Sequence, residues 1–164
     1  MIRFALKSLA VLGISMIVVA GTRAGTEIAE RDGWVVLATP HAYAALVKRV
    51  DQAAKANKIG IVTRASATAG AKKVLDKTIP GNMVIGLYHP RFAVRMLEAS
   101  VAAGIEAPIR VYVTENADGT ATLSYKTPSH VFAPYMSDGG DALKALAQEL
   151  DQLFDKLTRE AAAK

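Results

Sequence analysis

Seven arginine, tyrosine and histidine residues in the middle of this chain have the chemistry needed to hold a small anion. Arg91 and Arg95 are one helical turn apart and can share a helix face. Guanidinium groups bind carboxylates through paired hydrogen bonds, so these residues predict a ligand site. In the alternative, Arg95 pairs with Glu98 or Glu106 and the tyrosines close the edge of the core. The candidate ligand-binding residues are Tyr88, His89, Arg91, Arg95, Arg110, Tyr112 and Tyr125.

Two of the three histidines raise the alternative of an enzyme. His89 follows a predicted strand and His130 lies in a loop, and either could act as the general base of a hydrolase-like reaction. Ser129 precedes His130, but adjacency in sequence is not the geometry of a catalytic triad, and no Gly-x-Ser-x-Gly elbow is present. We therefore assign no catalytic residue.

The sequence also argues against metal and cofactor sites. It contains no His-x-His or His-Glu-x-x-His pair and no glycine-rich phosphate loop. It contains no cysteine, which excludes cysteine nucleophiles, cysteine–zinc sites, iron–sulfur clusters and disulfides. We expect no metal and no cofactor.

The first 24 residues have the pattern of a secretory signal peptide. Arg3 and Lys7 lead into an apolar stretch, and Thr22 and Ala24 stand where a signal peptidase reads small residues. The apolar stretch is about 12 residues long, whereas a membrane-spanning helix needs roughly 20. We expect cleavage near Ala24, a periplasmic or secreted protein, and no stable membrane anchor after cleavage.

Residues 25–164 are the length of a single domain. The formal net charge of the whole chain is +5, but three of its basic residues lie in the predicted signal peptide. The remainder is close to neutral and has no basic stripe, so we expect no nucleic-acid partner. The densest basic group is Lys72, Lys73 and Lys77, which is either a solvated face or a patch for anions or lipids.

Hydrophobic patterns predict five strands and four helices, of which the second is weak. The strands are Trp34–Ala38, Ile59–Arg64, Met83–Tyr88, Ile109–Thr114 and Thr120–Tyr125, and Asp118–Gly119 is the turn between the last two. The first helix begins after the N-cap Thr39, and the second, weak helix covers 66–78. The third runs from Pro90 to Gly104 and the fourth from Asp141 to Glu160.

This order, β-α-β-(α)-β-α-β-β-α, predicts an α+β domain. The late hairpin favours a mainly antiparallel sheet of about five strands with helices packed on one face. In the first strand of this hairpin, Ile109–Thr114, the side chains of Ile109 and Val111 point to one face of the sheet. The side chains of Arg110, Tyr112 and Thr114 point to the opposite face. The polar face is a solvated surface, a ligand cleft or a subunit contact.

Three segments resemble the domain of unknown function 302 family. They read Val-Ile-Gly-Leu-Tyr-His-Pro at 84–90, Ala-Pro-Ile-Arg-Val-Tyr-Val at 107–113 and Leu-Ser-Tyr-Lys-Thr-Pro-Ser at 123–129. The resemblance spans about residues 34–130 and implies a small α+β fold with a curved antiparallel sheet, a homodimer and no established activity. A histidine typical of the family after the second strand has no counterpart in the run at 64–69.

The sequence therefore predicts an exported, non-enzymatic protein that binds a small ligand or serves as an accessory protein, using the open face of the sheet. The enzyme with His89 or His130 as general base is the alternative. A third possibility is an interaction protein of the cell envelope that uses the apolar stripe Leu143–Leu157, although such a stripe is typical of core packing.

Overall fold

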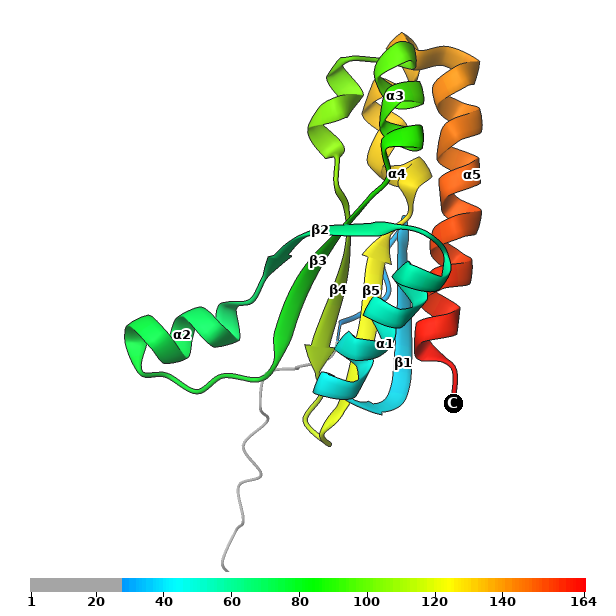
Figure 1. Cartoon of the computed structure of the whole chain (residues 1–164). Coiled ribbons are helices and arrows are strands. Elements are labelled where there is room, and N and C mark those ends of the chain that lie inside the picture. Colours follow the sequence, from blue (N-terminus) through cyan, green and yellow to red (C-terminus); the bar gives the residue numbers. More distant parts are fainter. Residues whose placement is uncertain (1–27) are drawn as a thin grey trace, which may run out of the picture.

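Five antiparallel strands form one sheet in the order β1-β5-β4-β3-β2 in this computed structural model, which describes residues 28–164 (Figure 1). The predicted signal peptide lies outside the described residues. All five predicted strands are confirmed, with ends that differ by a few residues. Each segment forms a strand because it is a short run of β-branched and aromatic residues between turns. They are β1 (Trp34–Ala42), β2 (Gly60–Ala65), β3 (Asn82–Tyr88), β4 (Ile109–Glu115) and β5 (Thr120–Lys126).

Helices pack on one face of this sheet and leave the other face open. The long helix α5 contacts α1, α3 and α4, and α1 also contacts each of the five strands (Figure 1). The helices are α1 (Tyr43–Ala56), α2 (Ala67–Leu75), α3 (Pro90–Ala99), α4 (Pro128–Phe132) and α5 (Met136–Ala162), with short 3-10 helices η1 (Ala102–Glu106) and η2 (Ala133–Tyr135). The predicted α+β architecture is confirmed.

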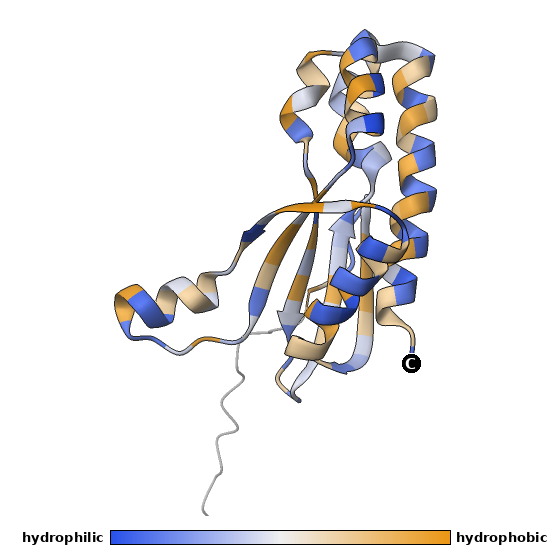
Figure 2. Cartoon of the chain, viewed as in Figure 1, coloured by the Kyte–Doolittle hydropathy of each residue, from blue (hydrophilic) through white to orange (hydrophobic). Residues whose placement is uncertain are grey.

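The apolar stripe of α5 forms the centre of the core. Leu143, Leu146 and Leu157 are at most 1% exposed and belong to the same buried cluster as the inward-facing residues of β4 and β5. Figure 2 shows hydrophobic and hydrophilic positions alternating along α5 with the helical period. The stripe is therefore core packing rather than an interaction surface. The helix kinks at Gly140, whose φ of 53° suits glycine.

The predicted start of the first helix at Thr39 and Pro40 is wrong. Strand β1 continues to Ala42, and the Thr39 hydroxyl donates to the carbonyl of Ala121 across the sheet instead of capping a helix. Pro40 is tolerated because β1 is an edge strand and its register with β5 shifts between Thr39 and Ala42. Helix α1 begins after Ala42 without a side-chain cap.

Candidate functional site

A pocket with a cavity volume of about 320 Å³ lies on the open face of the sheet, where β1, β5 and β4 run side by side. We call it the open-face pocket. Its polar and aromatic lining includes Trp34, Arg110, Tyr112, Ser124 and Lys126. The volume lies in the range of small-molecule sites.

Strand register brings these side chains together. Trp34 pairs with Lys126 between β1 and β5, and Tyr112 pairs with Ser124 between β4 and β5. Paired residues of neighbouring strands point to the same face, and residues two apart on a strand do so as well. The alternation of β4 and β5 therefore places a hydroxyl, a phenol and two cations around one hollow.

Ser124 lines the open-face pocket, and its buried hydroxyl has no hydrogen-bond partner among the described residues. Ser124 is 0% exposed, and the pocket around it is lined by strand residues together with Glu106 of η1 and Val131 of α4. Thr114, which faces the same side, has the other buried side-chain oxygen without a partner in the part of the chain that the structure describes. An unpartnered buried polar group costs about 1–3 kcal/mol, so a ligand that bonds to Ser124 recovers stability.

Two cations border the pocket, and one carboxylate opposes them. Arg110 and Lys126 are exposed, and neither forms an ion pair with any residue within 28–164. The Lys126 ammonium lies 5.8 Å from the centre of the Trp34 ring. Glu106 accepts a hydrogen bond from the Tyr135 hydroxyl at 2.8 Å, and this bond raises the pKa of Tyr135.

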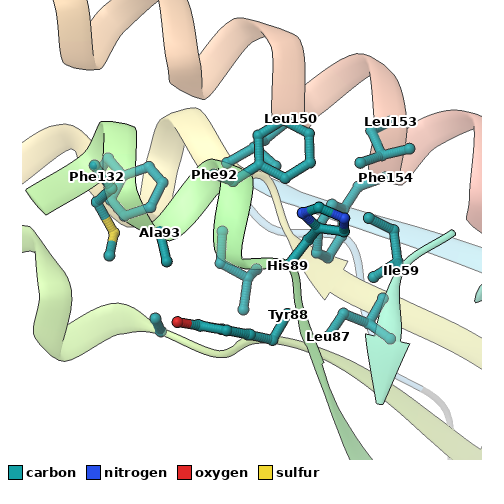
Figure 3. A pocket seen from close by; sticks show the side chains of 13 residues that line it. Ile59, Leu87, Tyr88, His89, Phe92, Ala93, Phe132, Leu150, Leu153 and Phe154 are labelled. Carbon is teal, nitrogen blue, oxygen red and sulfur yellow. The ribbon is translucent and has the colours of Figure 1, made fainter. Parts of the chain in front are cut away.

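A second pocket lies beneath α3, between that helix, α4, α5 and the end of the sheet (Figure 3). We call it the α3 pocket. Its cavity volume is about 40 Å³, and its walls are aliphatic and aromatic apart from Tyr88 and His89. Of the open-face lining, only Ile109 also lines this pocket.

His89 caps the N-terminus of α3. Its Nδ1 accepts the backbone N–H of Arg91 at 3.0 Å, so in the neutral imidazole the proton is on Nε2. Neither ring nitrogen is then a free acceptor, and this arrangement does not favour His89 as a general base.

His130 is exposed, and its ring packs against the backbone of Gly33. The neighbouring Ser129 donates its backbone N–H to Asp151, and its hydroxyl donates to Thr127 rather than to a histidine. Across residues 28–164, no hydrogen bond joins Ser129 to the ring of His130. This geometry does not provide a serine–histidine pair.

The structure divides the seven candidate residues between two sides of the molecule. Arg110 and Tyr112 border the open-face pocket, whereas Tyr88 and His89 line the α3 pocket. Tyr125 also lines the open-face pocket, although its buried ring packs on Phe154 with 5.7 Å between centres. Neither pocket is lined by Arg91, whose guanidinium carbon is 4.5 Å from the centre of the Phe92 ring, or by Arg95, which pairs with Glu149 at 2.6 Å.

Sequence reasoning missed Trp34, Ser124 and Lys126 as site residues. Ser124 and Lys126 follow the same alternation that selects Arg110 and Tyr112, so the hairpin pattern could have identified them. Trp34 carries no such signal, because it joins the site only through the pairing of β1 with β5.

Residues 28–164 contain neither a cluster of metal-binding side chains nor a membrane-spanning helix. No group of three or more histidine, aspartate or glutamate side chains in this region could hold a metal ion. No helix in it has the length and apolar character needed to cross a membrane.

Comparison with known proteins identifies the family. No functionally curated protein matches the sequence. The crystal structure of an uncharacterized conserved DUF302 protein from Bacillus stearothermophilus superposes with a TM-score of 0.70 at 16% sequence identity, covering 80% of this chain and 99% of that chain. This similarity shows a shared fold. The sequence profile of the family described as "Domain of unknown function DUF302" matches residues 35–161, so the chain belongs to that family.

Proposed function

We propose that this protein is an exported, non-enzymatic protein that binds a small anionic ligand in the open-face pocket. The signal-peptide pattern of residues 1–24 supports export. The absence of an assembled serine–histidine pair among residues 28–164 supports a binding role over hydrolysis.

The charges of the pocket indicate the class of ligand. Arg110 can bind a carboxylate or phosphate oxygen pair, and Lys126 adds a second positive charge on the neighbouring strand. Glu106 disfavours a purely anionic molecule and favours a ligand that also carries a hydroxyl or amino donor. Trp34 and Val84 supply apolar walls for a short carbon skeleton. A small hydroxy acid, amino acid or phosphorylated alcohol fits this arrangement.

The unpartnered hydroxyl of Ser124 is the observation that carries this proposal. A sheet face that only contacts water has no need of a buried polar atom in the lining of a hollow. A ligand that moves aside the side chains shielding Ser124 would satisfy its hydroxyl, while Arg110 and Lys126 neutralise the charge of the ligand.

The test is a thermal-shift screen of the purified protein with small hydroxy acids, amino acids and phosphorylated alcohols, followed by calorimetric titration of any hit. Arg110→Gln and Lys126→Gln should each weaken binding about tenfold, the loss expected for a charge-assisted hydrogen bond. Lys48→Gln is the control, because Lys48 is an exposed cation on α1 that lines none of the pockets described above. A screen without hits, or equal affinities for all variants, would refute the proposal.

A homodimer is the partner that we propose for this domain. Strand β2 is an edge strand and is exposed over most of its length, so it offers unpaired backbone groups. Helix α2 buries none of its residues, and Val74 and Leu75 near its end are 76% and 63% exposed. Light scattering after size exclusion should give twice the chain mass, and Val74→Ser with Leu75→Ser should shift it towards the monomer. A single-chain mass for the unmodified protein would exclude the dimer.

A further inference from the structure

We propose that the α3 pocket is a second binding site, which takes the aliphatic tail of a short-chain carboxylate and holds the carboxylate at His89 and Arg91. This site is separate from the open-face pocket, because the two linings share only Ile109. The proposal therefore does not depend on the function proposed above.

The interior of the α3 pocket suits a short apolar tail. Six of its large lining side chains are at most 6% exposed, namely Leu87, Phe92, Met96, Phe132, Leu150 and Phe154. One water molecule needs a cavity volume of about 10–15 Å³. A cavity of about 40 Å³ therefore has room for about three or four heavy atoms. A water cluster of that size would find few partners here, because Tyr88 and His89 are the only lining residues with polar side chains.

The rim of the pocket suits an anion. The imidazole of His89 meets the edge of the Phe92 ring with 5.9 Å between centres, and the Arg91 guanidinium lies 4.5 Å from the centre of the same ring. His89 and Phe92 line the pocket (Figure 3), and the Arg91 guanidinium lies against the same Phe92 ring. Since Nδ1 of His89 accepts from Arg91, the neutral ring offers Nε2–H as a donor.

No acid within the described residues neutralises this rim. Arg91 is exposed and forms no ion pair in residues 28–164, unlike Arg95 one turn later, which pairs with Glu149. The first turn of α3 contains no acidic residue, although that end of a helix favours negative charge. An apolar cavity beside an unneutralised guanidinium and an N–H donor is complementary to an amphipathic anion with a short tail.

The experiment titrates the purified protein with acetate, butyrate and octanoate, and with the uncharged probe 1-butanol, by calorimetry and by thermal shift. Butyrate should bind at least about tenfold more tightly than acetate, because its extra methylene groups enter the cavity. It should also bind about tenfold more tightly than 1-butanol, which cannot pair with Arg91. Octanoate should gain little over butyrate, because the cavity is filled.

Three variants locate the bound butyrate. Ala93→Val places methyl groups in the cavity and should abolish binding, and Arg91→Gln should weaken it about tenfold while leaving the core intact. Arg95→Gln, on the same helix, is the matched control and should retain full affinity. Arg91→Gln alone decides the matter if Ala93→Val does not fold.

Three outcomes would overturn the proposal. The first is no saturable binding of butyrate, which would make the cavity an ordinary packing void. The second is equal affinity for acetate and butyrate, which would exclude the cavity as the place of the tail. The third is loss of butyrate binding in Arg110→Gln with retention in Arg91→Gln, which would move the carboxylate to the open-face pocket.

Discussion

Replacement of Ser124 by alanine should stabilise the unliganded protein. Most substitutions of fully buried residues destabilise, typically by about 1 kcal/mol, so the expected sign is unusual. It follows from the structure because the Ser124 hydroxyl is buried at 0% exposure and has no partner within residues 28–164. Alanine removes that oxygen and leaves the Cβ in place, so the packing against neighbouring strands changes little.

The size of the effect can be worked from the desolvation of one hydroxyl. An unsatisfied buried polar group costs about 1–3 kcal/mol, and part of that cost is offset by the lost dispersion contacts of the oxygen. We expect a net gain of about 1 kcal/mol, which corresponds to a rise in Tm of about 3 °C for a domain of this length. The same variant should lose affinity for the ligand of the open-face pocket.

Two matched variants control for the effect of removing a hydroxyl. Thr114→Val replaces the other unpartnered hydroxyl on the same face and should also stabilise. Thr39→Val should destabilise by about 1–3 kcal/mol, because the Thr39 hydroxyl donates to the Ala121 carbonyl at 2.7 Å and is also buried. Urea denaturation followed by circular dichroism measures all three. A loss of stability in Ser124→Ala comparable with that in Thr39→Val would show that the hydroxyl is satisfied, and the reasoning about the open-face pocket would fail.

Three other predictions test the core, a turn and the response to alkali. Leu146→Ala should lower the unfolding free energy by about 2–5 kcal/mol in urea denaturation, because this side chain is 1% exposed at the centre of the core. Gly33→Ala should cost about 1–2 kcal/mol, because Gly33 has a φ of 72° and an added Cβ would overlap the His130 ring; an unchanged Tm would contradict this. Burial raises the pKa of Tyr125 above its ordinary value of 10.0, so the phenol stabilises the fold below that pH and the contribution is lost as the pH rises through the folded-state pKa. Tyr125→Phe should therefore reduce the fall of Tm above pH 10, and an unaltered alkaline profile would refute the linkage.

Local periodicity accounts for most of the fold that the sequence predicted. The alternation of β4 and β5 separates a polar from an aliphatic face, and the leucine spacing of α5 predicts one buried stripe. The error at Thr39 arises because a long-range contact overrides a local sequence signal. Thr-Pro is a strong local signal for a helix start, but a cross-strand hydrogen bond to Ala121 uses the same hydroxyl. Helix α4 was missed because its five residues are too few to show a period.

The candidate site was less predictable than the fold because it depends on which strands are neighbours. The alternation of β4 identified Arg110 and Tyr112, and nothing in the chain order shows that β1 lies beside β5. That pairing brings Trp34 next to Lys126, although 90 or so residues separate them along the chain. Residue type alone could not distinguish Arg91 and Arg110, which form no ion pair within residues 28–164, from Arg95, whose partner Glu149 is far away in the sequence.

Strand β4 explains why a single predicted cluster becomes two candidate sites. Ile109 and Arg110 are adjacent in sequence, so their side chains leave opposite faces of the sheet. Arg110 borders the open-face pocket, while Ile109 is 8% exposed and lines both pockets at the end of the strand. The two cavities are therefore separated there by little more than the thickness of one strand. A polar anion and an aliphatic carboxylate would bind on opposite sides of the same backbone, and their binding would be independent unless a ligand displaces Ile109.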